Sequence, residues 1–503
     1  MSTSAVLSLD QGTTGSTALV IAGDGRILGR AYSEFTQHFP RPGWVEHDAE
    51  ELRDVTIRVA RTALEEARNR EPHSVEAVGI ANQRETVVVW DRETGRPVHR
   101  AIVWQDRRTA SMCRDLKSAG VEGEIRERTG LVLDPYFSGT KLRWLLDHDA
   151  SLRERAERGE LAAGTIDAWL VYSLTGGEVH ATDRTNASRT LLYDLRSDGW
   201  EDRLLDLLGV PGEMLPEIRA SAGDFGTTSG DLLGLDVPIA GVAGDQQAAL
   251  FGQGCWSPGL AKNTYGTGAF VLLHTGDEPV PSSHGLLTTV ACDPRGDRAF
   301  ALEGAIFIAG AAIQWLRDQL GILEAASESE ALARSLDGND GVYFVPALVG
   351  LGAPHWNPDV RGVIAGLTLG TTRAHLVRAA LEAMAYRTAE VLRAMEAESG
   401  VKARELRVDG GASENDWLMR FQAGLLGVPV RRPAQVQTTA LGAAGLAGLR
   451  VGLWKSGDEF LAAQGEPRTF RAAMGKKERE DLVAGWERVL NAARALAGSE
   501  ARE

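Results

Sequence analysis

A short glycine and threonine pattern occurs twice in this sequence, about half the chain apart. The first copy is Gly12-Thr13-Thr14-Gly15 and the second is Gly266-Thr267-Gly268, and each lies between two β-rich runs, which are 5–9 and 16–21, then 260–263 and 269–273. A strand, a glycine turn and a second strand predict a β-hairpin. Recurrence at half of the 503 residues predicts two related domains, each opening with such a hairpin, rather than a solenoid of short repeats.

The residues after each hairpin predict further strands and helices. After the first we expect a strand near 26–35, an amphipathic helix over 48–70 and a strand over 75–81. After the second we expect helices over 311–320, 372–399 and 413–426, with a strand over 405–408. No linker rich in proline and serine separates the halves, so the pattern places the boundary near residue 250. We therefore expect an N-terminal domain over 1–250 and a C-terminal domain over 251–503, covered by a last helix over 476–496.

Composition excludes several classes of protein. The formal net charge of −15 argues against strong, sequence-independent attraction to nucleic acid or an anionic membrane. The three cysteines, Cys113, Cys255 and Cys292, lie far apart without a C-x-x-C or H-E-x-x-H motif, which argues against a disulfide framework or a zinc site. The N-terminus lacks the pattern of a signal peptide, and 341–358, the longest uncharged candidate for a membrane span, contains three prolines. We expect no membrane span, reduced thiols and a cytoplasmic location.

Phosphate binding would need glycine loops of an unusual kind, because the sequence contains neither G-x-x-x-x-G-K-[ST] nor G-x-G-x-x-G. The turn at 12–15 offers closely spaced backbone N–H groups and two hydroxyls, and Asp10 at the end of the first strand could hold a hydrated Mg²⁺. A single turn of this kind is more simply a tight hairpin. Its second copy favours two facing hairpins that bind a polyphosphate from both sides.

Paired glycines also follow a later strand. Gly410 and Gly411 end the strand over 405–408 and precede a helix, where bare backbone could lie against a flat base or sugar. We expect Asn415 on the first turn of that helix. The simpler interpretation of the pair is an ordinary helix entry.

An acidic residue stands between an apolar strand and a helix just before the second hairpin. This is Asp245, which follows Gly244 and precedes Gln246 and Gln247. In an arbitrary protein it would be a helix N-cap. Between two phosphate-binding hairpins, the same carboxylate could accept the proton of an acceptor hydroxyl as a general base.

Charged and aromatic side chains could form an acceptor site. Arg84 and Glu85 follow a buried strand directly, and neighbouring strand residues face opposite ways, so a shared role requires a loop or a bulge. The alternative is a surface ion pair. Trp104, Tyr136 and Phe270 could line the carbon side of a small polyol, although aromatic residues in such positions are usually part of a core.

These segments resemble the FGGY family of carbohydrate kinases, within the actin, hexokinase and sugar kinase superfamily, and among them the members that phosphorylate glycerol. The resemblance runs from about residue 7 to 453. It is carried by L-D-Q-G-T-T (9–14), P-G-W-V-E-H-D (42–48), N-Q-R-E-T (82–86), A-I-V-W-Q (101–105), D-P-Y-F-S-G-T-K (134–141), T-N-A-S-R-T (185–190), A-G-D-Q-Q-A-A-L-F-G-Q (243–253), K-N-T-Y-G-T-G (262–268), G-L-G-A-P (350–354) and R-V-D-G-G-A (407–412). It implies an α/β fold of two ribonuclease-H-like, actin-like ATPase domains with a cleft between them.

The resemblance also implies an activity and a set of site residues. The activity is ATP-dependent phosphorylation of glycerol to sn-glycerol 3-phosphate, as part of glycerol catabolism, with Asp245 as the base and with Asp10 and Asp245 at Mg²⁺. The residues implied to bind glycerol are Arg84, Glu85, Trp104, Tyr136, Asp245, Gln246 and Phe270. Those implied to bind ATP are Thr13, Thr14, Gly15, Thr267, Gly310, Gln314, Gly411 and Asn415. Members are commonly homodimers or homotetramers.

The sequence departs from the family pattern at two places. Thr17 stands where many relatives carry an arginine. The segment 226–233 lacks the arginine-containing loop of members inhibited by fructose 1,6-bisphosphate and the histidine that some relatives phosphorylate, so we expect weak control by that sugar phosphate. The alternatives are a kinase for another small polyol or ketose, a catalytically silent glycerol or nucleotide sensor, and an actin-like assembly protein.

Overall fold

The first hairpin opens a five-stranded sheet in the N-terminal half. The computed structural model describes residues 3–500, and β1 and β2 pair antiparallel in it, as predicted. β3 extends the antiparallel order, while β6 and β14 run parallel to β1 on its other side. The strand order is β14-β6-β1-β2-β3, with bounds β1 (Thr3–Gln11), β2 (Gly15–Ala22), β3 (Ile27–Glu34), β6 (His73–Asn82) and β14 (Ile239–Gly244).

The second hairpin has the same place in a seven-stranded sheet of the C-terminal half. Its order is β17-β18-β16-β15-β21-β22-β23, in which β15, β16 and β18 are antiparallel and β21 and β22 run parallel to β15. The strands are β15 (Leu260–Tyr265), β16 (Ala269–Gly276), β17 (Leu287–Cys292), β18 (Arg298–Ile306), β21 (Glu405–Asp409), β22 (Val430–Arg432) and β23 (Arg468–Phe470). From β18 to β22 this sheet repeats the first one, which confirms an α/β fold with two related halves.

Glycine is required where each hairpin meets its neighbouring strand. In the first turn, Gly12 N–H donates to the Gly15 carbonyl at 2.9 Å. A Cβ atom on Gly15 would lie 2.7 Å from the Ser33 carbonyl oxygen, and one on Gly268 would lie 2.4 Å from the Ile306 carbonyl oxygen. Both distances are far below contact, so a side chain at either position would push the hairpin away from the next strand.

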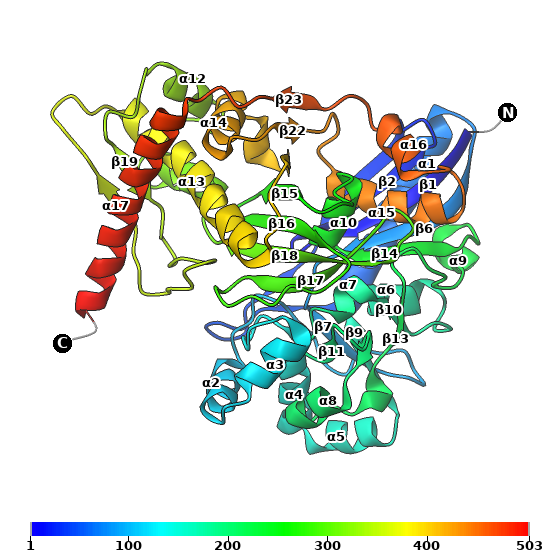
Figure 1. Cartoon of the computed structure of the whole chain (residues 1–503). Coiled ribbons are helices and arrows are strands. Elements are labelled where there is room, and N and C mark those ends of the chain that lie inside the picture. The colour runs from blue at the N-terminus through cyan, green and yellow to red at the C-terminus, as the bar shows by residue number, and fades with distance from the viewer. Residues whose placement is uncertain (1–2, 501–503) are drawn as a thin grey trace.

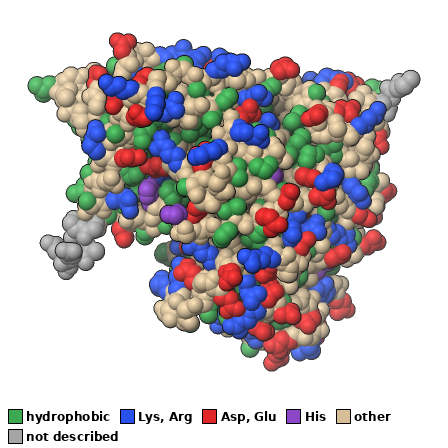
Figure 2. Space-filling view, viewed as in Figure 1, with side chains coloured by type: hydrophobic (Ala, Val, Ile, Leu, Met, Phe, Trp, Pro, Cys, Tyr) green, Lys and Arg blue, Asp and Glu red, His purple; other side chains and the backbone are tan. Residues whose placement is uncertain are grey.

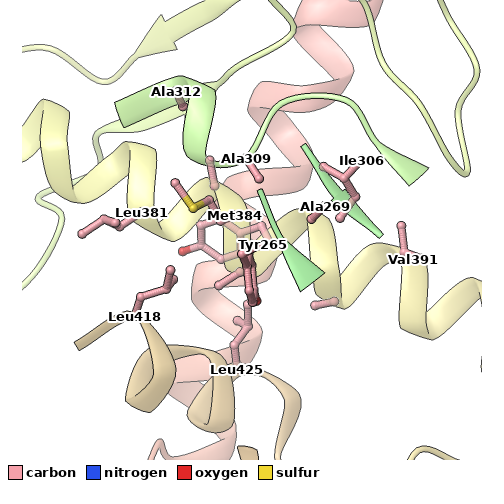
Figure 3. Close-up of a cluster of buried hydrophobic side chains, with 14 of the residues drawn as sticks. Tyr265, Ala269, Ile306, Ala309, Ala312, Leu381, Met384, Val391, Leu418 and Leu425 are labelled. Atoms are coloured by element: carbon pink, nitrogen blue, oxygen red, sulfur yellow. The ribbon is translucent and has the colours of Figure 1, made fainter. Parts of the chain in front are cut away.

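Long helices cover one face of each sheet. In the N-terminal half, α1 (Ala49–Arg70) packs on β2 and β3, and its N-cap Asp48 accepts hydrogen bonds from the next turn. In the C-terminal half, α13 (Arg373–Ser399) begins after the capping residue Thr372 and lies with α14 (Asp416–Leu426) over the hairpin β15–β16. Figure 3 shows the resulting core, in which Tyr265 and Ala269 of the hairpin belong to one buried cluster with Met384 of α13 and Leu418 of α14. This packing holds the second glycine turn on a rigid base.

Strand β1 is apolar on both faces, because helices cover both sides of the N-terminal sheet. Leu7 and Leu9 face the cluster that contains α1, whereas Val6 faces a second cluster that contains α15 (Thr438–Arg450). Figure 1 shows α15 and α16 (Gly457–Ala463), in orange, beside β1 and β2 in blue. Chain from the C-terminal half thus completes the core of the N-terminal half, an arrangement that the sequence patterns do not predict.

An inserted lobe lies at the bottom of Figure 1, and its elements flank Trp104 and Tyr136 in the chain. Its sheet has the order β4-β5-β8-β7-β9. The elements of this region are β4 (Gln37–His38), β5 (Glu46–His47), β7 (Val87–Asp91), β8 (Ala101–Ile102), β9 (Leu161–Thr165), α2 (Ala110–Ser118), α3 (Glu122–Thr129), α4 (Ser138–His148), α5 (Ala150–Glu157) and α8 (Asp202–Leu208).

The remaining elements are short, apart from α17. They are α6 (Ile166–Leu174), β10 (Ala181–Asp183), α7 (Arg184–Ala187), β11 (Tyr193–Asp194), β12 (Gly199–Trp200), the 3-10 turn η1 (Gly212–Met214), β13 (Glu217–Arg219), α9 (Gly230–Leu233), α10 (Asp245–Gly252), α11 (Gly310–Asp318), α12 (Glu328–Arg334), β19 (Tyr343–Val345), β20 (Val363–Ala365), the 3-10 turn η2 (Gly411–Glu414) and α17 (Lys476–Glu500).

The surface carries both signs of charge, and the three cysteines are buried. Across residues 3–500, no helix combines the length and the apolar character that crossing a bilayer requires. On the face shown in Figure 2, acidic and basic side chains are interspersed. All three cysteines are buried and none is in a disulfide, and burial raises the pKa of the Cys113 thiol to about 11.

Candidate active site

A sharp turn directs Arg84 and Glu85 to the same place. β6 ends at Asn82 and β7 begins at Val87, and between them Thr86 N–H donates to the Arg84 carbonyl at 2.8 Å, around Glu85 at φ 62°. A positive φ at the centre of such a three-residue turn is rare and strained for a residue with a side chain. The loop that allows Arg84 and Glu85 to face the same site is therefore present.

Arg84 contacts several of the residues predicted to bind the acceptor, and its side chain is 2% exposed. Its Nε lies 3.2 Å from Asp245 Oδ1, and its Nη2 donates to the Tyr136 hydroxyl at 3.4 Å. The guanidinium also lies 5.9 Å from the centre of the Phe270 ring. One buried cation thus joins residues from both halves that the sequence placed far apart.

Asp245 lies at the first residue of α10, and Gly244 occupies the N-cap position. Its side chain is 30% exposed, so part of the carboxylate reaches solvent while Oδ1 lies 3.2 Å from Arg84 Nε. The burial of Asp10 and the nearby charge of Asp245 raise the pKa of the Asp10 carboxyl to about 7. Two carboxylates therefore share one region at the ends of β1 and β14.

The aromatic residues form a wall beside the first hairpin. The Trp104 and Tyr136 rings meet edge to face, with centroids 5.5 Å apart. Trp104 Nε1 donates to Thr13 Oγ1 at 2.9 Å, which connects this wall to the glycine turn. Gln83 also binds this turn, because its side-chain amide donates to the Gly12 carbonyl at 3.1 Å.

Gln246 is buried and contacts a lysine that our sequence argument missed. Lys262 Nζ donates to Gln246 Oε1 at 2.5 Å and to Thr264 Oγ1 at 2.8 Å. Burial lowers the pKa of Lys262 to about 8, against the attraction of Asp409 and Asp245. Its segment, 262–268, carries the family resemblance, but nothing in the segment marked the lysine itself as buried.

Arg189 and Glu303, to which the sequence patterns gave no role, contact Arg84 and Glu85. Arg189 Nε donates to Glu85 Oε1 at 2.6 Å, and Glu303 accepts from both Arg84 and Arg189. Arg189 belongs to the segment 185–190, a family match to which we assigned no role. Glu303 lies within β18, where no motif drew attention to it.

Two of the predicted nucleotide residues, Thr267 and Gly310, lie side by side at the second hairpin. The Thr267 carbonyl accepts from Ala309 N–H at 2.9 Å, and the Gly266 carbonyl accepts from Gly310 N–H at 3.0 Å, so the start of α11 sits on the turn. A Cβ atom on Gly310 would lie 2.6 Å from the Gly266 carbonyl oxygen. Thr267 and Gln314 are exposed and free to meet a ligand surface.

Gly410 brings the end of β21 against the same hairpin. It has φ 80°, and a Cβ atom there would lie 2.2 Å from the Tyr265 carbonyl oxygen. Gly411 is exposed, with no atom within 4 Å of a Cβ placed on it. The sequence predicted Asn415 on the first turn of the helix, and this is wrong. Asn415 is the N-cap of α14, where its Oδ1 accepts from Leu418 N–H at 2.9 Å. The 3-10 turn η2 delays the start of that helix.

On the first hairpin, Thr14 is exposed at the tip and Gly15 is buried against β3. Thr17, the departure from the family pattern, pairs in register with Asp10. Its side chain is uncharged, so this position places no cation beside Asp10.

Comparison with known proteins covers both halves. The N-terminal and C-terminal domain models of the FGGY family of carbohydrate kinases match residues 5–252 and 261–451. A glycerol kinase of Deinococcus radiodurans is 56% identical over 489 residues, 97% of each chain, and one of Carboxydothermus hydrogenoformans is 54% identical over 490 residues, 97% of this chain and 98% of the relative. The crystal structure of Plasmodium falciparum glycerol kinase with ADP is similar with a TM-score of 0.93, at 33% identity and 98% coverage of both chains. Gluconate kinase from Lactobacillus acidophilus, 20% identical, shares the fold with a TM-score of 0.87 over 99% of both chains.

Proposed function

The chain belongs to the FGGY family of carbohydrate kinases, and we propose that it transfers the γ-phosphoryl group of ATP to glycerol, giving sn-glycerol 3-phosphate. The observation that carries this proposal is the group formed by Arg84, Tyr136, Phe270 and Asp245, which joins a cation, a hydroxyl, an apolar ring and a half-open carboxylate at one place. That combination suits a small polyol, which has hydroxyls to bind and a C–H face to cover.

Each acceptor residue has a distinct role in the proposal. Arg84, Glu85, Tyr136, Asp245 and Gln246 bind the hydroxyl groups, and Trp104 and Phe270 pack against the carbon chain. Asp245 accepts the proton of the attacking hydroxyl, which its partial exposure supports. Aromatic rings packed against the carbon chain would narrow the acceptor space, which favours a three-carbon acceptor over a longer sugar.

The nucleotide lies on the other side of Asp245 in this proposal. Thr13, Thr14, Gly15 and Thr267 contact the phosphates, and Gly310, Gln314, Gly411 and Asn415 contact the nucleoside. The open space at Gly411 supports this, because it leaves room for the nucleoside next to the backbone. Asn415 contributes through the second hydrogen of its amide nitrogen, because its Oδ1 caps α14 and its Nδ2 donates to Ser329 Oγ at 3.3 Å. Closure of the halves would exclude water, which would otherwise compete with glycerol for the phosphoryl group.

Asp10 and Asp245 fit a hydrated Mg²⁺. The charge of Asp245 helps to raise the pKa of Asp10, and a divalent cation between the two would remove that repulsion. Mg²⁺ commonly binds one or two carboxylates and keeps several waters. When bound with ATP, it would neutralise charge on the phosphates.

The proposal also covers the roles of the two halves, the location of the protein and its oligomeric state. The N-terminal half, 1–250, supplies most of the acceptor site and the C-terminal half, 251–503, supplies most of the nucleotide site. A cytoplasmic location and a homodimer or homotetramer follow from the family resemblance.

A panel of acceptors tests the proposed function. The purified protein is given Mg²⁺ and ATP with glycerol, a tetritol, a pentulose or no acceptor, and ADP release is measured. We expect turnover that depends on glycerol and far exceeds that with the longer acceptors. Preference for another polyol or ketose would point to a sister kinase, while hydrolysis without an acceptor, or no turnover, would point to a sensor or an assembly protein.

A further inference from the structure

Four buried charged side chains form a closed ring at the acceptor site. Arg84 donates to the two oxygens of Glu303 at 2.5 and 3.1 Å, and Arg189 Nη2 donates to Glu303 Oε1 at 3.0 Å. Arg189 Nε donates to Glu85 Oε1 at 2.6 Å, and Glu85 Oε1 lies 3.8 Å from Arg84 Nε, which closes the ring. All four side chains are at most 2% exposed.

Glu303 is the member of the ring that comes from the C-terminal half. It lies on β18, opposite Leu272 of β16 and Leu287 of β17, so two paired strands fix its backbone. The other three members come from the N-terminal half. The contact between Glu303 and the two arginines is therefore a bond between the halves, made directly at the acceptor site.

The ring pairs two arginines with two glutamates, and burial raises the pKa of Glu85 against the attraction of Arg189 and Arg84. Burial opposes the ionisation of Glu303, but Arg189 and Arg84 outweigh this effect and lower the pKa of Glu303 to about 2. Removing one member would leave an unpaired charge in the interior, which a protein avoids by rearranging nearby groups. For Arg84 the nearest alternative carboxylate is Asp245, 3.2 Å from its Nε.

The geometry divides the edges of the Arg84 guanidinium between two acids. Both terminal nitrogens donate to Glu303, with longer hydrogen bonds from Nη1 to Gln247 and from Nη2 to Tyr136, whereas the Nε edge faces Asp245. Without Glu303, the forked edge could turn onto Asp245 and pair with both of its oxygens, since guanidinium and carboxylate groups favour two parallel hydrogen bonds. Asp245 would then be less available to an acceptor hydroxyl.

We propose that Glu303 is a positioning residue of the acceptor site, which keeps the forked edge of Arg84 away from Asp245 and holds Arg189 against Glu85. This inference rests on the proposed function. It means that the acceptor site is complete only when the β18 strand of the C-terminal half is docked on the β6–β7 loop of the N-terminal half. Glu303 itself does not touch the acceptor.

Glu303→Gln tests the proposal, because it keeps the size of the side chain and removes its charge. We expect the KM for glycerol to rise by about tenfold or more, while the KM for ATP stays within about threefold, since only acceptor contacts lose their orientation. Calorimetric binding of glycerol without nucleotide should weaken by a similar factor. The matched control is Glu382→Gln, a carboxylate that is 1% exposed and paired with Arg378 in the same half, away from the ring. We expect Glu382→Gln to leave both KM values unchanged.

The possible outcomes separate the two proposals. If the wild-type protein shows no glycerol-dependent turnover, the proposed function is wrong. If the wild type turns over glycerol and Glu303→Gln keeps the wild-type KM and affinity for glycerol, the positioning role alone is wrong, as it is if the KM for ATP rises equally. Should Glu303→Gln fail to fold, Glu303→Asp keeps the charge but shortens the reach, and a wild-type KM for glycerol in that variant would overturn the role.

Discussion

A Cβ atom on Gly442 of α15 would lie 1.8 Å from the carbonyl oxygen of Ala248 in α10. A glycine of α10 makes a similar close contact with α15, because a Cβ atom on Gly252 would lie 2.2 Å from the Thr438 carbonyl oxygen. These two helices follow β14 and β22, the last equivalent strands of the two halves. They cross between the sheets in direct backbone contact, and α10 carries Asp245 at its first residue.

Gly442→Ala should therefore force the two helices apart. We expect the free energy of unfolding to fall by about 1–3 kcal/mol, the usual cost of overpacking a close contact. Thermal or denaturant unfolding measures it. The matched control is Gly123→Ala on α3, where a Cβ atom meets nothing within 4 Å, and there alanine should leave the stability unchanged or raise it. Equal stability of the two variants would contradict the helix contact.

Asp245→Asn should abolish the base while keeping the shape of the side chain. We expect kcat to fall by about 10² to 10⁴, the range typical of a lost general base. Affinity for ADP, measured by calorimetry, should be largely retained, because the residues proposed to contact the nucleoside lie on α11, on η2 and at the cap of α14 and do not include Asp245. Turnover close to that of the wild type would remove Asp245 from the mechanism.

Neighbouring glycines at the nucleotide side should respond differently to alanine. Gly410→Ala combines φ 80° with a contact of 2.2 Å to the Tyr265 carbonyl oxygen, so we expect a loss of about 1–3 kcal/mol in stability. Gly411→Ala enters open space and should leave stability unchanged. Because bare backbone at 411 is proposed to lie against the nucleotide, the KM for ATP should still rise. A normal KM for ATP in Gly411→Ala would place the nucleotide elsewhere.

A buried acid away from the proposed site should make stability depend on pH. Asp167 accepts from Thr165 Oγ1 at 2.5 Å and from Thr182 Oγ1 at 2.6 Å, and burial and the charge of Asp183 raise the pKa of Asp167 from 3.8 to about 7. Between these values the folded protein holds a proton that the unfolded chain releases. The free energy of unfolding should therefore fall as pH rises through this window, by at most about 1.4 kcal/mol per pH unit, and level off above it.

Asp167→Asn removes the titrating carboxyl of Asp167, and with it the pH-dependent contribution of this group to stability. Denaturant unfolding of the wild type and the variant at several pH values between about 5 and 8 measures it. We expect the difference in stability between the two proteins to shift in favour of the variant as pH rises. A difference that stays constant over the window would contradict the raised pKa.

Fructose 1,6-bisphosphate should have little effect on turnover. The segment 226–233 contains no lysine, arginine or histidine. The cation that reaches it, Arg61 of α1, already donates to the carbonyls of Leu232 and Asp231 at 2.6 and 2.9 Å. The check is formation of glycerol 3-phosphate, measured directly, with and without the sugar phosphate. Strong inhibition at millimolar concentration would contradict this expectation.

Local patterns predicted much of the fold correctly. The two hairpins, α1, α13 and β21 all appear within a few residues of their predicted bounds, because alternation, helical spacing and glycine turns act over short stretches of chain. The delayed start of α14 was missed, since a 3-10 turn and a capped helix have similar composition. The crossing of α15 onto the first sheet was also missed, because no local pattern states which sheet an apolar helix will cover.

The sequence by itself determined the two related halves, the glycine turns and the family, together with a set of residues whose roles follow from resemblance. Only the tertiary structure decided which charges meet. Arg84, Arg189 and Glu303 stand far apart in the chain and carry no shared motif, yet they pair in the interior at distances of 2.5–3.1 Å. The physical reason is that buried charges need partners, and a partner is supplied by whichever strand packs there, however distant it is in sequence.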